Sequence, residues 1–154
     1  METKELLRRV KIFEGLTEEE IDKFASIATE ESFPAKSIII EEGTDGRSLY
    51  IVRRGTVSVS KVDGELEIEL VKLVAGAHFG EMSLIEDAKT SARVTAYNDV
   101  DCLVLGREPF LNLMDNEVAI AAKVYKNFTL SLSERLRTTS RELLTWKPEL
   151  EKKA

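Results

Sequence analysis

The residues whose types and spacing could do chemistry lie between Gly76 and Ala96. Gly80 is followed by Glu81-Met82-Ser83-Leu84-Ile85, a run that can form one short helical turn. Glycine lets an anion approach the backbone, and the first amides of a helical turn have no partner within the helix. Glu81 fits beside an anion if it accepts a hydrogen bond from a neutral group, such as a sugar hydroxyl. The stretch therefore predicts a site for a phosphate with a hydroxyl next to it.

Each of these residues also has a purely structural interpretation. A glutamate in the first turn of a helix is favoured by the helix macrodipole. Small residues such as Ser83 and Ser91 also serve tight packing. Both interpretations stay open at the level of the sequence.

No other set of side chains is spaced for chemistry. His78 is the single histidine and Cys102 the single cysteine, so neither a catalytic triad, nor a Cys-His pair, nor a metal site is indicated. We expect His78 to be a solvated loop residue. Cys102 lies in an apolar run and is expected to be a buried core residue, which favours a reducing compartment. The sequence therefore predicts a binding protein that is not an enzyme and holds no metal.

Length and charge narrow the class of protein further. The chain has 154 residues and a net charge of −6, which fits a single domain, residues 1–154, and argues against nucleic acid as the main partner. The N-terminus has no apolar signal core, and no apolar run is long enough to span a membrane. We therefore expect a cytoplasmic protein.

Helices are expected at the start of the chain, over about residues 2–33. Residues 2–13 carry apolar side chains at helical spacing. A second helix begins at Thr17, because Thr17 and Glu20 form a capping box. Pro34 is expected to end this helical region.

Short strands with regular glycine turns are expected over about residues 34–106. The strands are predicted at residues 37–41, 49–52, 56–60 and 66–74, then from about residue 91, and finally up to Leu105 after a break at Asn98-Asp99. Asp63-Gly64 is a hairpin signal. This pattern predicts a small antiparallel barrel or sandwich.

Two more helices are expected over about residues 107–146, the second running from about residue 117 to about residue 144. The second helix carries a stripe at steps of three and four: Val118, Ala122, Tyr125, Leu132, Leu136, Thr139 and Leu143. The stripe indicates either a helix packed on its own barrel or a two-helix seam between subunits. Trp146, Pro148 and the charged tail from Glu149 to Ala154 are expected to be frayed.

The order of these residues resembles a known family. Phe79-Gly80-Glu81-Met82-Ser83-Leu84, followed by Ser91-Ala92-Arg93-Val94-Thr95-Ala96, is similar to the phosphate-binding cassette of cyclic nucleotide-binding domains. That family includes regulatory subunits of cyclic AMP-dependent kinase and bacterial catabolite activators. The resemblance implies an α+β fold, in which short N-terminal helices and a long C-terminal helix flank an antiparallel β-roll of jelly-roll type.

The resemblance also implies a ligand and a site. The ligand is a cyclic nucleotide, cyclic AMP or cyclic GMP, with Glu81 accepting from the ribose 2′-hydroxyl. Arg135-Leu136-Arg137-Thr138-Thr139-Ser140 is similar to the stretch with which activators contact the base, although ordinary helix positions explain it as well. The implied nucleotide-binding residues are Val71, Gly80, Glu81, Met82, Ser83, Thr90, Ser91, Thr139 and Ser140.

The sequence departs from the family at one charged position. Where the family has an arginine that pairs with the cyclic phosphate, this chain has Thr90. Lys89 could swing in from the loop, whereas Arg93 should face outward if Val94 faces the core. Two hypotheses follow. The chain is a sensor that signals through its C-terminal helix, or it is a module for dimerisation or protein interaction that has lost nucleotide binding. No DNA-binding domain is expected within the sequence.

Overall fold

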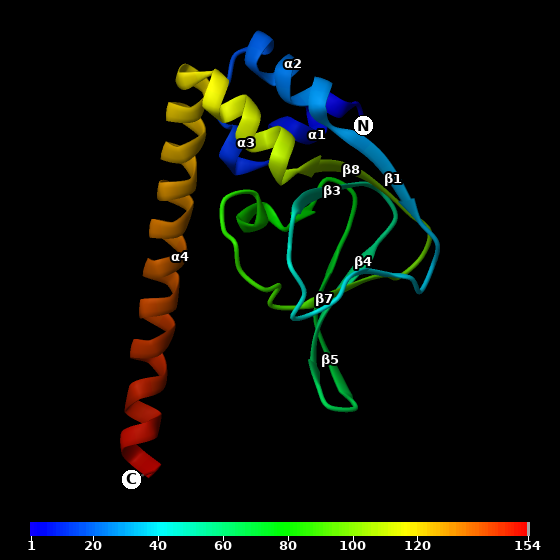
Figure 1. Ribbon diagram of the computed structural model, residues 1–154. Coiled ribbons are helices and arrows are strands. Elements are labelled where there is room, and N and C mark those ends of the chain that lie inside the picture. Colours follow the sequence, from blue (N-terminus) through cyan, green and yellow to red (C-terminus); the bar gives the residue numbers. More distant parts are fainter. Residues whose placement is uncertain (154) are drawn as a thin grey trace.

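Helices from both ends of the chain pack on one end of a β-roll, and a long C-terminal helix stands beside the roll (Figure 1). The structure is a computed structural model that describes the backbone of residues 1–153 and the side chains through Thr145. The α+β fold predicted from the sequence is confirmed.

The N-terminal helical region is shorter and more broken than predicted. It consists of α1 (Thr3–Arg8), the 3-10 helix η1 (Lys11–Phe13) and α2 (Glu18–Ile27). The capping box at the start of α2 is confirmed, because Thr17 and Glu20 exchange side-chain-to-backbone hydrogen bonds. The prediction of one helix over residues 2–13 was wrong, since the chain leaves the α-helix after Arg8 and buries Val10, Ile12 and Phe13 in the core.

Within residues 1–153, eight antiparallel strands form two four-stranded sheets. Their orders are β1-β8-β3-β6 and β2-β7-β4-β5. The strand bounds are β1 Thr29–Phe33, β2 Ile38–Ile40, β3 Ser48–Arg54, β4 Val57–Asp63, β5 Leu66–Leu73, β6 His78–Phe79, β7 Arg93–Ala96 and β8 Val100–Gly106. The Asp63-Gly64 turn between β4 and β5 forms as predicted, with Gly64 at a φ of 63°.

Strand β1 corrects the predicted boundary between helices and roll. The sequence placed residues 29–33 with the helices and began the strands after Pro34, but these five residues pair with β8 from Thr29↔Val104 to Phe33↔Val100. The segment is mostly exposed and polar, so it has no alternation of apolar residues to announce a strand. Pairing with β8, far away in the sequence, decides its conformation.

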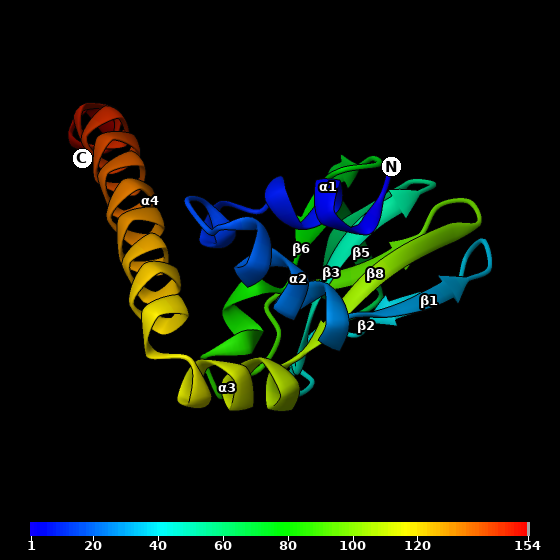
Figure 2. The ribbon, with the colours of Figure 1, turned by 90° about the horizontal axis from the view of Figure 1, so that it is seen from above.

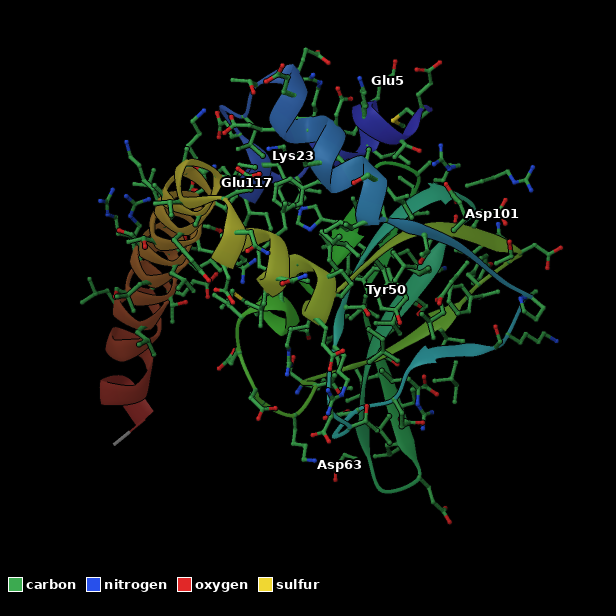
Figure 3. The ribbon with its side chains drawn as sticks, turned by 45° about the horizontal axis from the view of Figure 1, so that its top comes forward. Glu5, Lys23, Tyr50, Asp63, Asp101 and Glu117 are labelled. Atoms are coloured by element: carbon green, nitrogen blue, oxygen red, sulfur yellow. The ribbon has the colours of Figure 1, made fainter. Side chains whose placement is uncertain are left out.

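The two faces of β3 show how the roll and the helices share the core. Leu49 and Ile51 are buried against the helical layer, in one cluster with Phe24 and Phe110. Tyr50 points the other way, into the roll, where its ring stacks on Phe79 with centroids 5.0 Å apart (Figure 3). The alternation along one strand thus supports both cores.

Helices α3 (Arg107–Asn116) and α4 (Val118–Lys153) complete the chain. The prediction that the last helix ends near residue 144, before a frayed tail, was wrong, because the backbone is helical to Lys153 and includes Pro148. One proline removes a single helical hydrogen bond, and good helix formers follow it. Ala154 lies outside the described residues. Lys23 of α2 and Glu117, which precedes α4, form an ion pair of 2.6 Å (Figure 3).

The face of α4 that packs on the domain is not the stripe predicted from the sequence. Ile120, Val124 and Phe128 are buried against the domain. The bulky stripe residues are exposed instead: Val118, Tyr125, Leu132, Leu136 and Leu143. Beyond residue 128 the helix continues past the helical layer, and the view from above in Figure 2 shows it standing to one side of the domain. Packing on its own barrel therefore does not explain the stripe.

Candidate functional site

The turn that follows β6 has the geometry expected of an anion-binding cassette. Gly80 adopts a φ of 84°, and the 3-10 helix η2 (Glu81–Leu84) begins directly after it. A Cβ atom at Gly80 would lie 2.5 Å from the carbonyl oxygen of Ser48 on β3. The backbone conformation and the close approach to β3 together require glycine at this position.

Glu81 connects this cassette with α4. Its side chain is 13% exposed, and one carboxylate oxygen, Oε1, is ion-paired with the guanidinium of Arg135. The other oxygen, Oε2, lies 3.3 Å from Nδ1 of His78. A cavity of about 550 Å³ opens at this contact, between η1, β6, η2 and α4, and Thr139 lines it from the helix side.

The charge of Glu81 is stabilised by its two neighbours. Burial raises the pKa of this carboxyl, but the contacts with His78 and Arg135 lower it by a larger amount, so that the resulting pKa is about 2. The carboxylate is therefore ionised at neutral pH. In this state it can accept a hydroxyl hydrogen bond while Arg135 remains bound.

The depressed pKa of Glu81 predicts a loss of stability in acid. Because the folded-state pKa lies below the ordinary value of 4.5, the contribution is complete above about pH 4.5 and is lost as the pH falls through about 2. We expect it to reach up to about 3 kcal/mol of the free energy of unfolding. Urea unfolding of wild type and Glu81→Gln across this range measures it.

The variant Glu86→Gln is the matched control for this acid prediction. Glu86 follows η2, and its carboxylate makes no ion pair within the described part of the chain. Glu86→Gln should keep the wild-type dependence on pH, whereas Glu81→Gln should flatten it. Equal slopes in wild type and Glu81→Gln would contradict the assignment.

Arg107 holds the cassette against the turn between β2 and β3. Its guanidinium donates to the backbone oxygens of Ser83, Gly46 and Glu86. The side chain is only 14% exposed. Three backbone acceptors from two loops therefore fix the cassette through one cation.

Thr90 and Lys89 both bind to the turn between β2 and β3. Thr90 Oγ1 donates to the Glu41 carbonyl at 2.6 Å and accepts from the Thr44 amide at 3.1 Å. Lys89 forms an ion pair of 2.7 Å with Asp45. Lys89, the cation that could have reached the cassette from its own loop, is thus bound to the turn between β2 and β3 instead.

Arg93 faces away from the cassette, as its neighbours in the sequence predicted. Val94 is buried, while Arg93 lies on the outer face of the second sheet and pairs with Glu41 at 2.8 Å and Glu67 at 3.3 Å. The strand itself begins at Arg93 rather than near Ser91. Lys89 and Arg93 are thus both paired with carboxylates, whereas Arg107 is bonded to backbone oxygens.

The other predicted site residues are spread around the cassette. Met82 is partly buried against the core, and the Ser91 carbonyl accepts from Lys61. Val71 is exposed on β5, which pairs with β4 in the hairpin that projects from the roll (Figure 1). Ser140 is exposed on α4 and does not line the cavity that Thr139 lines.

Three residues of the site were missed or misjudged from the sequence. His78 was predicted to be solvated, but it lines the cavity, and its Nδ1 atom is buried. Arg135 was noted only as part of a motif, and Arg107 was given no role. Their partners lie at least 20 residues away in the sequence, so sequence spacing offered no signal for either contact.

Comparison with known proteins identifies the family. Residues 30–117 match the cyclic nucleotide-binding domain. The chain belongs to this family. The match includes the β-roll, the cassette and α3.

Several proteins are similar over most of this cyclic nucleotide-binding domain. Mouse cGMP-dependent protein kinase 2 is 32% identical over 151 residues, which is 95% of this chain and 20% of the kinase. The crystal structure of the Thermus thermophilus catabolite activator protein is 33% identical, with a TM-score of 0.74 over 87% of this chain and 62% of that one. The regulatory domain of Toxoplasma gondii PKA, crystallised with cAMP, is 31% identical, with a TM-score of 0.67 over 71% of this chain and 42% of that one.

The domain spans about a fifth of the kinase that it matches. Among residues 1–153, no helix is both long and apolar enough to cross a bilayer. The part of the chain that the structure describes also has no cluster of three His, Cys, Asp or Glu side chains suited to a metal ion.

Proposed function

We propose that this domain is a non-catalytic sensor, which binds cyclic AMP or cyclic GMP and signals through α4. The observation that carries the proposal is the ion pair between Glu81 of the cassette and Arg135 of the helix. The nucleotides named for the relatives, cGMP for the mouse kinase and cAMP for the Toxoplasma protein, support this class of ligand.

The ligand and α4 would both contact the carboxylate of Glu81. The ribose hydroxyl donates to Glu81, the amides after Gly80 face the phosphate, and the base extends toward Thr139. Because Arg135 binds the same carboxylate, any change in the position of Glu81 alters the attachment of α4. A ligand shifts the helix only by the difference between its affinities for the two positions.

Titration calorimetry with cyclic AMP and cyclic GMP tests the proposal. We expect a dissociation constant in the micromolar range, a higher melting temperature with ligand, and weaker binding to Glu81→Gln. The control Glu86→Gln removes the same charge two residues beyond Leu84 and should bind like wild type. If neither nucleotide binds or raises the melting temperature, the sensor function is wrong.

A second candidate function is a protein-interaction module that has lost its ligand. It is favoured by Thr90, whose hydroxyl is already hydrogen-bonded to Glu41 and Thr44. The exposed stripe of α4 supplies the surface. We propose a second copy of this chain as the partner, and an unidentified protein partner is the alternative. A nucleotide dissociation constant in the low micromolar range would exclude loss of the ligand.

Substitution on the stripe should weaken a dimer by roughly a hundredfold to ten-thousandfold. Leu136 is 68% exposed, and burying such a side chain in each of two copies is worth roughly 1.5–3 kcal/mol per copy. We expect Leu136→Gln to shift sedimentation equilibrium toward the monomer. The control Leu130→Gln changes a 58% exposed leucine off the stripe and should leave the association unchanged. A wild-type chain that stays monomeric would refute the self-association.

We propose a reducing, cytoplasmic setting for the domain. Its single cysteine, Cys102, is buried on β8, and burial raises the pKa of the thiol to about 12. Such a thiol stays protonated and unreactive. This supports a core role for Cys102 rather than a chemical one.

A further inference from the structure

His78 occupies an unusual position for the only histidine of the chain. It pairs with Ile51 across β3 and β6, while its neighbour Phe79 pairs with Tyr50 and points into the roll. The imidazole therefore faces the helical layer and lines the cavity beside α4. Its Nδ1 atom is buried and has no hydrogen bond of good geometry.

The carboxylate of Glu81 lies close to that atom. Nδ1 lies 3.3 Å from Oε2, while Arg135 occupies Oε1. A neutral imidazole can donate to the carboxylate only as the Nδ1–H tautomer, whereas a protonated one donates from Nδ1 and also attracts the carboxylate by its charge. Protonation places Glu81 between two cations.

The other charged groups around the imidazole come from three elements. Lys11 of η1 and Glu134 of α4 pair with each other. Glu142 of α4 lines the same cavity. The guanidinium of Arg9 packs on Gly76, in the turn before β6. In the described part of the chain none of these groups pairs with the imidazole, whereas Glu81 lies 3.3 Å from its Nδ1 atom, so Glu81 is the main electrostatic partner of His78.

We propose that His78 is a positioning residue for Glu81 and that its protonation makes the binding of an anionic ligand at the cassette depend on pH. The inference rests on the proposed function and concerns the regulation of the same site. Lys89, Arg93 and Arg107 already have partners. A protonated His78 therefore adds a positive charge directly beside Glu81, on top of the one that Arg135 supplies. Binding should therefore tighten as the pH falls and the imidazole gains its proton.

The contact can be tested without any ligand. Because the sequence has a single histidine, its imidazole NMR signals report His78 alone. We expect Glu81→Gln to lower the midpoint of the titration by roughly half a pH unit to one unit, and Arg135→Gln to raise it. The control Glu142→Gln removes a charge from the same cavity and should shift the midpoint by less than half as much. An unchanged midpoint in Glu81→Gln would overturn the assignment.

The link to binding is tested with cyclic AMP at about pH 6 and about pH 8. We expect the wild type to bind roughly three- to tenfold more tightly at the lower pH. The variant His78→Gln keeps a polar N–H but cannot change its charge, so its affinity should be nearly equal at the two values. The same pH dependence in wild type and His78→Gln would overturn the linkage.

The two tests separate failure of this inference from failure of the proposed function. If cyclic AMP and cyclic GMP bind at neither pH, the sensor function is wrong and the linkage falls with it. The ligand-free titration then still decides whether His78 positions Glu81. If nucleotide binds equally at both values, the sensor function stands and the role of His78 is refuted.

Discussion

Replacing Gly80 by alanine should destabilise the domain by about 3 kcal/mol and disorder the cassette. The left-handed backbone at Gly80, with a φ of 84°, costs an L-residue roughly 1–2 kcal/mol. The new Cβ would also lie 2.5 Å from the Ser48 carbonyl. Backbone cannot rotate away as a side chain can, so β3 or the cassette must move, at a cost of about 1–3 kcal/mol. Urea unfolding measures the sum.

Gly64→Ala separates the two costs. Gly64 has a φ of 63° in the turn between β4 and β5, and no atom lies within 4 Å of a Cβ built on it. It should therefore lose only the backbone cost, about 1 kcal/mol. If Gly80→Ala were no more destabilising than Gly64→Ala, the close approach to Ser48 would not constrain the cassette.

Local signals in the sequence predicted much of the architecture around Gly80. The glycine before a short polar helix, the capping box at Thr17 and the Asp63-Gly64 turn each depend on a few adjacent residues. All three form as predicted. Such features carry their own conformational preference and need no distant partner.

Features that depend on distant partners were the ones that the sequence could not provide. Strand β1 forms because of β8, which lies about 70 residues further on. The packed face of α4 could not be assigned from the sequence, since a helix with apolar residues on two faces does not reveal which one its own domain covers. Periodicity identified the helix, and only the tertiary structure assigned its faces.

The charges of the site illustrate the same limit. The composition showed that the chain is acidic, but not that Glu81 would bind Arg135 or that Lys89 would bind Asp45. These pairings decide what the cassette can hold. The absence of an arginine at position 90 was visible in the sequence, whereas the engagement of the neighbouring cations was not.

Thr90→Arg should therefore raise the affinity for cyclic nucleotide by roughly ten- to a hundred-and-fifty-fold. A charge-assisted bidentate contact with a phosphate is worth about 1.5–3 kcal/mol. The substitution also removes the hydrogen bonds with Glu41 and Thr44. We expect these losses to lower the free energy of unfolding by about 1–2 kcal/mol in the absence of ligand. Calorimetry and urea unfolding measure the two effects.

Thr90→Gln is the matched control, because it loses the same two hydrogen bonds with Glu41 and Thr44 and adds no charge. If missing charge limits the site, the arginine variant binds nucleotide far better than the glutamine variant, and the advantage shrinks as salt is added. If the two variants bind alike, charge at position 90 does not limit binding. The turn that Arg107 holds then limits access to the cassette, and Lys89 stays paired with Asp45 in both variants. If only Thr90→Arg binds, the pocket has kept its shape and lost its ligand, which favours an interaction module acting through the exposed stripe of α4.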